Sequence, residues 1–520
     1  MQIYSFSPFG YEGSLVTVEV DLRRGIPAID LVGLADGAVK EARERMQAAI
    51  RNSGFDFPPE RILISLSPAD LKKEGAGFDL PIALGVLCAK NDENNSYKDD
   101  SPILIMGELE LSGKVRPVRG IHAAAATAAS GGIMRCIVPA ANANEAREVS
   151  GMKVFGAENL EEAFNALSNP ELFTERKSTS INKEDEIPSD CEIIEGVLFP
   201  KFSEEMDFSK IKGQKKLIRG LQIAAAGGHN LIAVGAPGCG KTLCIQKFPA
   251  LLPLLTLEEA QPVTRILSLS GLLSPKEALV RIPPFRMPHQ TASIEGICGG
   301  GPNCRPGEIS LAHNGVLFLD EAAEFKSSVL QMLRVPLESE KITLSRAGRT
   351  TIFPASFQLM MASNPCPCGN FGSETKICLC SARSIEMYWK KFSAPLLDRI
   401  DLRINISNEN CMDTDDKIIT TEELRIPIAK ATKRQRERQG KKNAKLTAAE
   451  IANLCKIDDE SRMILDRAAE SHSLSPRAVA SCLKTARTIA DMEDNEKILS
   501  RHIAEAIEFR KAFNNFMNFE

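Results

Sequence analysis

The sequence contains no uninterrupted apolar run long enough to cross a bilayer. Residues 1–5 also lack the basic start and apolar core of a secretory signal, so we expect a cytoplasmic protein with no membrane partner. The formal net charge is only −4, and nucleic-acid binding would therefore need a local basic surface. Without an export signal, the 14 cysteines are expected to be thiols, with room for one metal cluster, rather than a disulfide framework.

Length and composition indicate several folded domains. A chain of 520 residues is too long for one hydrophobic core and should divide into about three domains. Alternating apolar and polar residues predict a first α/β or α+β domain at 1–168. Glu, Lys, Ser, Thr and Asn dominate the next stretch, which predicts a linker at 169–200. A nucleotide-binding module at 201–405 and a helical region at 406–520 complete the predicted layout.

A phosphate-binding loop lies near the middle of the chain. Residues 235–242 fit the pattern G-x-x-x-x-G-K-[ST], and the apolar run 230–234 before them predicts a buried strand. Glycines let backbone amides turn toward a triphosphate, Lys241 can reach the β- and γ-phosphates, and the Thr242 hydroxyl can bind Mg²⁺. The predicted ATP-binding residues are Gly235, Ala236, Pro237, Gly238, Cys239, Gly240, Lys241 and Thr242. A chance glycine turn is the alternative, and the flanking strand and helix signals argue against it.

Two further strand ends supply the other groups that ATP hydrolysis needs. The apolar run 315–319 ends in Asp320 and Glu321, of which the first is expected to hold Mg²⁺ through a water molecule and the second to polarise the attacking water. A third strand, 357–363, ends at Asn364, whose amide can reach the γ-phosphate or position that water. The alternatives are an ordinary strand capped by acidic residues and a turn asparagine before a proline.

Two close pairs of cysteines follow Asn364. Cys366 and Cys368 form the first pair, and Cys378 and Cys380 form the second across a short loop. Four thiolates are enough for a tetrahedral structural zinc site, which would leave no open position for water. The C-x-C spacing is tighter than the usual C-x₂-C, so four reduced thiols in a loop remain the alternative.

Three segments together resemble the ComM/YifB family, a group of bacterial AAA+ ATPases that are similar to the ATPase subunit of magnesium chelatase. The segments are 285–291, 305–321 and 395–402. The resemblance runs nearly end to end. Within the first domain, the segments 72–81 and 113–122 are similar to the proteolytic domain of Lon-type proteases.

The first domain lacks the nucleophile of those proteases. They use a Ser–Lys dyad, and the alignment places Gly77 at the serine and His122 at the lysine. Without a hydroxyl and its amine base there is no activated nucleophile, so a non-proteolytic domain is expected. The resemblance therefore implies an α/β protein with three parts. These are an AAA+ P-loop core of parallel sheet and flanking helices, an N-terminal Lon-protease-like α+β domain, and a C-terminal helical lid.

The resemblance also implies an assembly and a mode of action. The implied assembly is a homo-hexameric ring with ATP at the subunit interfaces, and one family member is a DNA branch-migration helicase of natural transformation. The family pattern suggests Arg399 as the finger that reaches a neighbour's γ-phosphate, because a guanidinium can neutralise transition-state charge. It suggests Arg477, at a helix start in the lid, as a second sensor. A surface or salt-bridge arginine is the alternative for each.

DNA contacts are expected on a hairpin at 341–353, whose tip carries Arg346 and Arg349. In related ATPases such a hairpin projects into the central channel, where a ring of basic tips could follow the backbone of single-stranded or branched DNA. Solvated arginines on an exposed hairpin are the alternative. A second basic run, 430–442, is interpreted as a solvated helix face.

We therefore expect an ATP- and Mg²⁺-dependent, ring-forming motor that acts on DNA as a helicase or branch-migration enzyme in recombination or natural transformation. Two alternatives stay open. One is a metal-insertion ATPase of the chelatase type, against which the Lon-like domain argues. The other is a chaperone or scaffold ATPase without DNA activity. Strong stimulation of hydrolysis by DNA would favour the motor over both.

Overall fold

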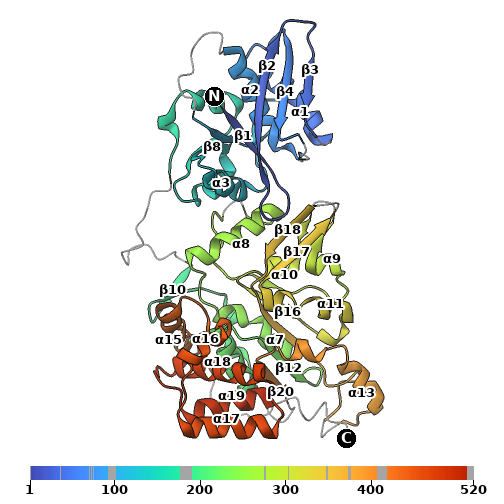
Figure 1. Ribbon diagram of the computed structural model, residues 1–520, viewed down its shortest axis with the longest axis vertical. Coiled ribbons are helices and arrows are strands. Elements are labelled where there is room, and N and C mark those ends of the chain that lie inside the picture. Colours follow the sequence, from blue (N-terminus) through green and yellow to red (C-terminus); the bar gives the residue numbers. More distant parts are fainter. Residues whose placement is uncertain are drawn as a thin grey trace.

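The structure is a computed structural model in which an N-terminal α/β domain stands at one end of an elongated molecule and the ATPase core with its helical region at the other (Figure 1). It describes residues 2–34, 37–69, 71, 73, 75–91, 101–175, 190–274, 277–301, 304–346, 349–372, 376–406 and 419–511. Within these ranges no helix has the length and apolar character that a membrane span requires.

The N-terminal domain is a seven-stranded mixed sheet with helices on both faces. The strand order is β3-β4-β2-β1-β5-β8-β9, in which β1–β2 and β2–β4 are antiparallel and the other pairs are parallel. The strands are β1 (Ile3–Ser7), β2 (Ser14–Arg23), β3 (Ile29–Val32), β4 (Arg61–Ser67), β5 (Ile103–Ile105), β8 (Arg135–Pro139) and β9 (Lys153–Ala157), with β6 (Glu108–Leu109) and β7 (Val115–Arg116) as a separate pair.

Two hydrophobic clusters flank this sheet. Helices α1 (Gly37–Asn52), α2 (Asp79–Asn91) and α5 (Leu160–Leu167) contribute to one, and α3 (Ile121–Ser130) and α4 (Ala143–Arg147) contribute to the other. Helix α2 is largely apolar and is buried from Asp79 to Cys88, as expected for a helix enclosed by its own domain.

The ATPase core is built on a five-stranded parallel sheet with the order β13-β16-β19-β12-β20. The strands are β12 (Leu231–Gly235), β13 (Phe285–Arg286), β16 (Val316–Leu319), β19 (Gln358–Ser363) and β20 (Leu402–Ile406). Along β12, Leu231 and Ala233 join one hydrophobic cluster while Ile232 and Val234 join the other, so both faces of the sheet are covered. Because all five strands are parallel, their carboxyl ends meet at one edge and their amino ends at the opposite edge.

Short elements surround the sheet. They are α6 (Lys215–Gly227), α7 (Lys241–Gln246), α8 (Leu257–Ser270), α9 (Ile294–Cys298), β14 (Gly299–Gly300), β15 (Arg305–Pro306), α10 (Glu308–Leu311), α11 (Ser327–Met332), α12 (Pro336–Ser339), β17 (Lys341–Arg346), β18 (Arg349–Pro354), α13 (Ala382–Trp389) and α14 (Ala394–Leu397). Helix α8 lies between the ATPase core and the N-terminal domain (Figure 1).

The C-terminal region is helical and packs on one face of the ATPase sheet. Its helices are α15 (Thr421–Gln439), α16 (Ala448–Leu454), α17 (Asp459–Ser471), α18 (Pro476–Met492) and α19 (Ser500–Lys511). Buried side chains of α18 and α19, such as Ile489 and Ile503, belong to the same hydrophobic cluster as Leu231 of β12. The helices and the core therefore share one interior.

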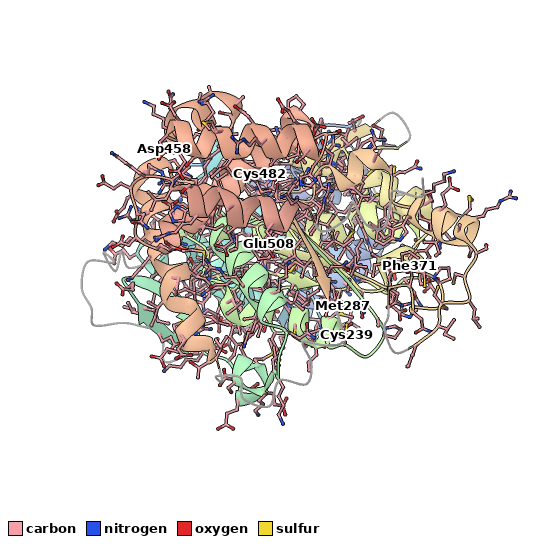
Figure 2. All side chains as sticks on the ribbon, turned by 90° about the horizontal axis from the view of Figure 1, so that it is seen from below. Cys239, Met287, Phe371, Asp458, Cys482 and Glu508 are labelled. Atoms are coloured by element: carbon pink, nitrogen blue, oxygen red, sulfur yellow. The ribbon has the colours of Figure 1, made fainter. Side chains whose placement is uncertain are left out.

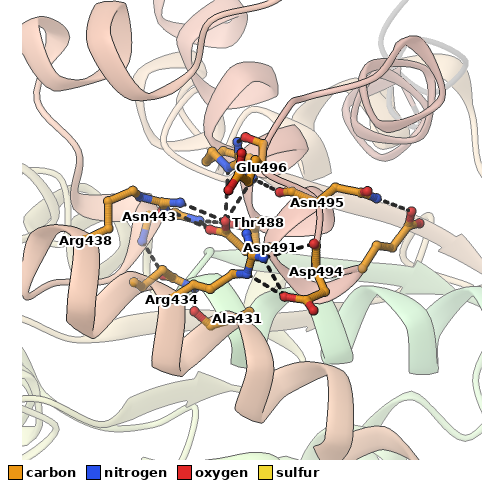
Figure 3. Close-up of polar contacts among 12 residues, drawn as sticks. Ala431, Arg434, Arg438, Asn443, Thr488, Asp491, Asp494, Asn495 and Glu496 are labelled. Carbon is orange, nitrogen blue, oxygen red and sulfur yellow. Dashed lines mark hydrogen bonds and ion pairs between the residues drawn. The ribbon is translucent and has the colours of Figure 1, made fainter.

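The basic run 430–442 was interpreted as a solvated helix face, but two of its arginines pair with carboxylates of another segment. In α15, Arg438 donates to both oxygens of Asp491 in α18, over 2.8 and 2.9 Å, and the Asp491 side chain has no exposed surface. Arg434 donates to Asp494 over 2.7 Å, and the Asn443 amide also donates to Asp491 (Figure 3). The run thus joins α15 to α18. Periodicity alone could not show this, because the partner carboxylates lie more than fifty residues further along the chain.

The ends of the predicted linker, 169–200, also differ from expectation. Phe173 is buried against the N-terminal domain, where Thr174 bridges to Val154. At the other end, β10 (Cys191–Ile194) and β11 (Val197–Pro200) form a hairpin whose Phe199 is buried in the ATPase core. Residues 176–189, between these two ends, lie outside the described residues.

Candidate nucleotide-binding site

The phosphate-binding loop connects β12 to α7 at the carboxyl edge of the sheet. Gly238 and Gly240 have φ of +80° and +82°, a region that side chains other than glycine rarely adopt, and no atom lies within 4 Å of the position that a Cβ would take at either residue. The loop therefore presents bare backbone on this side, which is what close approach of a phosphate requires. Cys239 of this loop is labelled in Figure 2, which views the molecule from below.

Lys241 lies folded against its own loop. Its Nζ donates to the carbonyl oxygens of Gly235 over 2.6 Å and of Ala236 over 2.8 Å, and to Oδ1 of Asn364 over 3.3 Å. Burial lowers the pKa of this ammonium. A phosphate oxygen would be a stronger partner than these neutral acceptors, because both the donor and the acceptor would then carry charge. The arrangement thus fits a lysine that turns from loop carbonyls to a triphosphate.

Thr242 and Asp320 present two oxygen atoms suited to a magnesium ion. The Thr242 hydroxyl donates to Oδ1 of Asp320 over 3.0 Å, and the same oxygen accepts from the amide of Glu321 over 3.0 Å. Adjacent ligands of an octahedral Mg²⁺ at 2.0–2.1 Å are about 2.9 Å apart, so the donor set and its spacing fit that ion. Glu321 is exposed and has φ of +48°, a strained value for a residue with a side chain.

Three strands thus bring Lys241, Thr242, Asp320, Glu321 and Asn364 to one edge of the sheet. The lysine and threonine follow β12, the two carboxylates follow β16, and the asparagine follows β19. In an open parallel sheet, ligands bind outside the carboxyl ends of the strands. This edge is therefore the place where a nucleotide and its magnesium ion would be held, by the phosphate loop and by Thr242 with Asp320.

Sequence reasoning missed one contact to the loop. Gln214 has φ of +62°, is buried, and donates through Nε2 to the carbonyl of Cys239 over 2.9 Å. Gln214 is the last residue of the segment 208–214, and the residue before this segment is Asp207. Asp207 in turn accepts from the amide and hydroxyl of Thr421 at the start of α15. In the sequence, the only sign of this turn was a polar residue, Gln214, next to Gly213. That pattern does not indicate which backbone group Gln214 contacts.

The cysteine loop adjoins the phosphate loop. A Cβ added to Gly369 would lie 2.5 Å from Cδ of Pro237, so the two loops are in close contact. The cluster's ligand sulfurs, those of Cys366, Cys368, Cys378 and Cys380, all lie within 4.8 Å of one another. Phe371, labelled in Figure 2, donates its amide to Cys366 over 3.4 Å.

The sulfur spacing suits a tetrahedral metal ion. Cys366 lies 3.3 Å from Cys368 and 3.7 Å from Cys378, whereas four sulfurs at 2.3 Å from a zinc ion would be about 3.8 Å apart. A thiolate is the form that binds metal. The four residues could therefore hold zinc with little rearrangement.

Arg399 and Arg477 are not at this edge. Arg399 lies just before β20, and its carbonyl accepts from Asn230, the residue before β12, over 2.9 Å. Arg477 lies in the first turn of α18, where Ser475 donates to Asp398 over 2.9 Å. Both arginines line a pocket of about 280 Å³ at the amino edge of the sheet. They cannot reach a phosphate held by the loop of their own chain, because the sheet lies between.

The hairpin predicted to touch DNA is present as β17 and β18. The strands are paired from Lys341 opposite Pro354 to Arg346 opposite Arg349 at the tip. The side chains of Arg346 and Arg349 lie outside the described residues. Nearer the base, the hydroxyl of Thr351 accepts from the amide of Tyr11, so the N-terminal domain contacts this hairpin directly.

The positions that correspond to the protease dyad have other surroundings. Gly77 lies in a single turn at 76–78, and no hydroxyl is available there. The Nε2 atom of His122 is 2.7 Å from Oε1 of Gln261 in α8, and burial lowers the pKa of this histidine to about 4. His122 is therefore neutral at neutral pH and takes part in the contact between the domains. Arg265, also in α8, donates to the carbonyl of Tyr11 over 2.9 Å.

A phosphate loop after β12 of a parallel sheet, acidic residues after β16 on the far side of β19, and a packed helical region define a P-loop ATPase of the AAA+ type. Comparison with known families agrees. The model of magnesium chelatase subunit ChlI matches residues 207–414, that of subunit ChlI of Mg-chelatase matches 18–142, and that of the ChlI C-terminal region matches 419–510.

The chain also resembles curated proteins over almost its whole length. It is 39% identical over 514 residues to competence protein ComM of Haemophilus influenzae, and the matched region covers 98% of this chain and 97% of that protein. It is 37% identical over 512 residues to the uncharacterized protein YifB of Escherichia coli, with 98% and 96% covered. The chain belongs to this ComM/YifB family of magnesium-chelatase-like AAA+ ATPases.

Proposed function

We propose that the protein hydrolyses ATP with Mg²⁺ at the carboxyl edge of its ATPase sheet. The observation that carries the proposal is the convergence of Lys241, Thr242, Asp320, Glu321 and Asn364 from three strands. Lysine binds the β- and γ-phosphates, threonine and aspartate hold the ion, glutamate polarises water, and asparagine orients it or the γ-phosphate. The Lys241→Ala variant should lose hydrolysis. Lys216→Ala, at a lysine that pairs with Glu508 on α19, should keep it.

The completed site requires a second copy of this chain. Arg399 and Arg477 lie at the amino edge, so they can serve only a nucleotide that a neighbouring subunit presents there. A closed ring of identical subunits satisfies this for every copy, and the family resemblance implies that the ring is a homo-hexamer. Each arginine would neutralise charge that develops on the transferred phosphoryl group.

Mixing two inactive variants tests this arrangement. Lys241→Ala leaves the arginines intact, and Arg399→Ala leaves the phosphate loop intact. In a mixed ring, a loop from the second variant can meet an arginine from the first, so part of the ATPase activity should return. If Arg399 acted within its own subunit, no combination would restore a complete site and the mixture would stay inactive.

We further propose that the motor acts on DNA as a helicase or branch-migration enzyme. The similarity to a protein named for competence supports this, as does the β17–β18 hairpin with an arginine at each side of its tip. Hydrolysis should rise strongly with single-stranded or branched DNA, and Arg346→Glu and Arg349→Glu should remove the rise. Lys341→Glu, at the base of the same hairpin, is the matched control. Stimulation that survives in both tip variants would refute the role of the hairpin, and no stimulation of the intact protein would favour a chelatase or scaffold.

A structural zinc ion in the cysteine loop is the third part of the proposal. The purified protein should contain about one zinc per chain, and Cys378→Ser should lower that content. Cys298→Ser, at a buried cysteine outside the cluster, should leave it unchanged. Equal zinc content in the two variants would overturn the assignment. Since Gly369 packs on Pro237, removal of zinc should also weaken ATP binding.

A further inference from the structure

A single carboxylate pairs with both arginines at the amino edge. Nη2 of Arg399 donates to Oε2 of Glu338, and Nη1 of Arg477 lies 3.6 Å from Oε1 of the same residue. Glu338 belongs to α12, whereas its partners come from the turn before β20 and from the start of α18. Three separate segments thus meet at one pair of oxygen atoms.

The exposure of these groups shows that the carboxylate can be replaced. The Glu338 side chain is 60% exposed and that of Arg477 is 43% exposed, whereas Arg399 is only 11% exposed and is also held by the carbonyl of Pro395 over 2.6 Å. Arg399 is therefore held in place by its own chain, and the Glu338 carboxylate lies on its solvent side. An ion pair whose carboxylate is exposed contributes little to stability, so a better anion can take the place of the carboxylate.

The charge of Glu338 is secured by its partners. The hydrogen bond from Arg399, with the nearby charges of both guanidinium groups, lowers the pKa of this carboxyl. The group is therefore anionic at neutral pH. It would repel a phosphate that approached the arginines while it remained between them. The neighbouring Glu340 has its own partner, Lys445, at 2.8 Å in the same pocket.

We propose that Glu338 stands in for the γ-phosphate of a neighbouring subunit and gives way to it when the ring assembles. The inference rests on the proposed function, because a second copy of this chain must bring its nucleotide to the pocket. A phosphate offers three oxygens to the two guanidinium forks, where the carboxylate offers two. ADP has no γ-phosphate and cannot replace Glu338, so this residue makes assembly depend on ATP.

The test is assembly of the full chain with a non-hydrolysable ATP analogue, followed by mass photometry. The nucleotide concentration at half-maximal assembly should be about three- to tenfold lower for Glu338→Gln than for the unchanged protein, since the two ion pairs of the exposed carboxylate no longer compete. Glu338→Gln should also assemble with ADP. Glu508→Gln removes the same charge from an exposed ion pair with Lys216 outside this pocket, and its midpoint should not move.

A second variant guards against a folding defect. Glu338→Asp keeps the charge but withdraws it by one methylene, and its midpoint should fall in the same direction. Equal midpoints for the unchanged protein and Glu338→Gln, or loss of assembly in Glu338→Gln with an unchanged thermal melt, would overturn the inference. Failure of the unchanged protein to assemble at any analogue concentration would instead refute the ring on which the inference rests.

Discussion

Two glycines of the cysteine loop offer a matched test of its contact with the phosphate loop. Gly369 and Gly372 have almost the same φ, +78° and +77°. A Cβ at Gly369 would lie 2.5 Å from Cδ and 2.6 Å from Cγ of Pro237, whereas a Cβ at Gly372 would have nothing within 4 Å. Changing each to alanine therefore adds the same backbone strain but pushes on the phosphate loop in only one case.

The two contributions can be estimated separately. A left-handed φ costs an alanine about 1–2 kcal/mol relative to glycine, and this applies to both variants. Carbon atoms in contact are normally about 3.5 Å apart or more, so the new Cβ at Gly369 requires Pro237 to move by about 1 Å. A misplacement of that size in a group that positions a substrate can reduce the rate about a hundredfold. We therefore expect kcat/KM for ATP to fall by about tenfold to a hundredfold in Gly369→Ala alone.

Binding of a fluorescent ATP analogue, kcat/KM for hydrolysis and thermal unfolding together check this expectation. Both variants should unfold at lower temperature than the unchanged protein, and Gly372→Ala should bind the analogue normally. Equal ATP affinity in the two variants would refute the reasoning, since it would mean that the contact between Gly369 and Pro237 does not set the position of the phosphate loop.

Two further predictions concern stability. Arg438→Ala should lower the free energy of unfolding by about 2–3 kcal/mol, because the unexposed Asp491 loses two charge-assisted hydrogen bonds. Arg434→Ala should lower it by only about 0.2–1 kcal/mol, because its partner Asp494 is 61% exposed. Urea denaturation measures both changes. Burial lowers the pKa of His122 from 6.5 to about 4, so between these values the unfolded chain binds a proton that the folded chain does not. The free energy of unfolding should therefore fall by about 3 kcal/mol, from this residue, as pH drops through this interval. The His122→Asn variant should lose correspondingly less stability between pH 7 and pH 4. An equal loss in the two proteins would show that His122 is not the group responsible.

The carboxyl edge of the ATPase sheet could be anticipated from sequence because its parts follow strands. A motif after 230–234, carboxylates after 315–319 and an amide after 357–363 must meet if the strands are parallel, and the structure brings them together. Glu338 and Gly369 gave no comparable signal. Their partners are distant in sequence, and no periodicity or spacing states which side chain a given surface residue will face.

The hairpin at 191–200 is different, because a signal was present. Glu195 and Gly196 have φ of +49° and +80°, as in the two-residue turn that joins tightly paired strands. The alternation on either side of them, from Cys191 to Pro200, is that of a strand pair. The polar composition of the preceding residues outweighed this pattern in the interpretation. Local alternation was the better guide, since Val197 and Phe199 are buried in the ATPase core.

At both edges of the sheet, the cations of the proposed site are held in internal contacts. Lys241 is satisfied by carbonyls of its own loop, and Arg399 by Glu338. A nucleoside diphosphate can replace the loop carbonyls around Lys241 but carries no group that could replace Glu338. Only a triphosphate between two copies of the chain offers oxygens to both, so in the proposed ring the γ-phosphate is the group that exchanges contacts within each subunit for contacts between subunits. Its cleavage would return the arginines to Glu338, and this reversal would couple hydrolysis to movement.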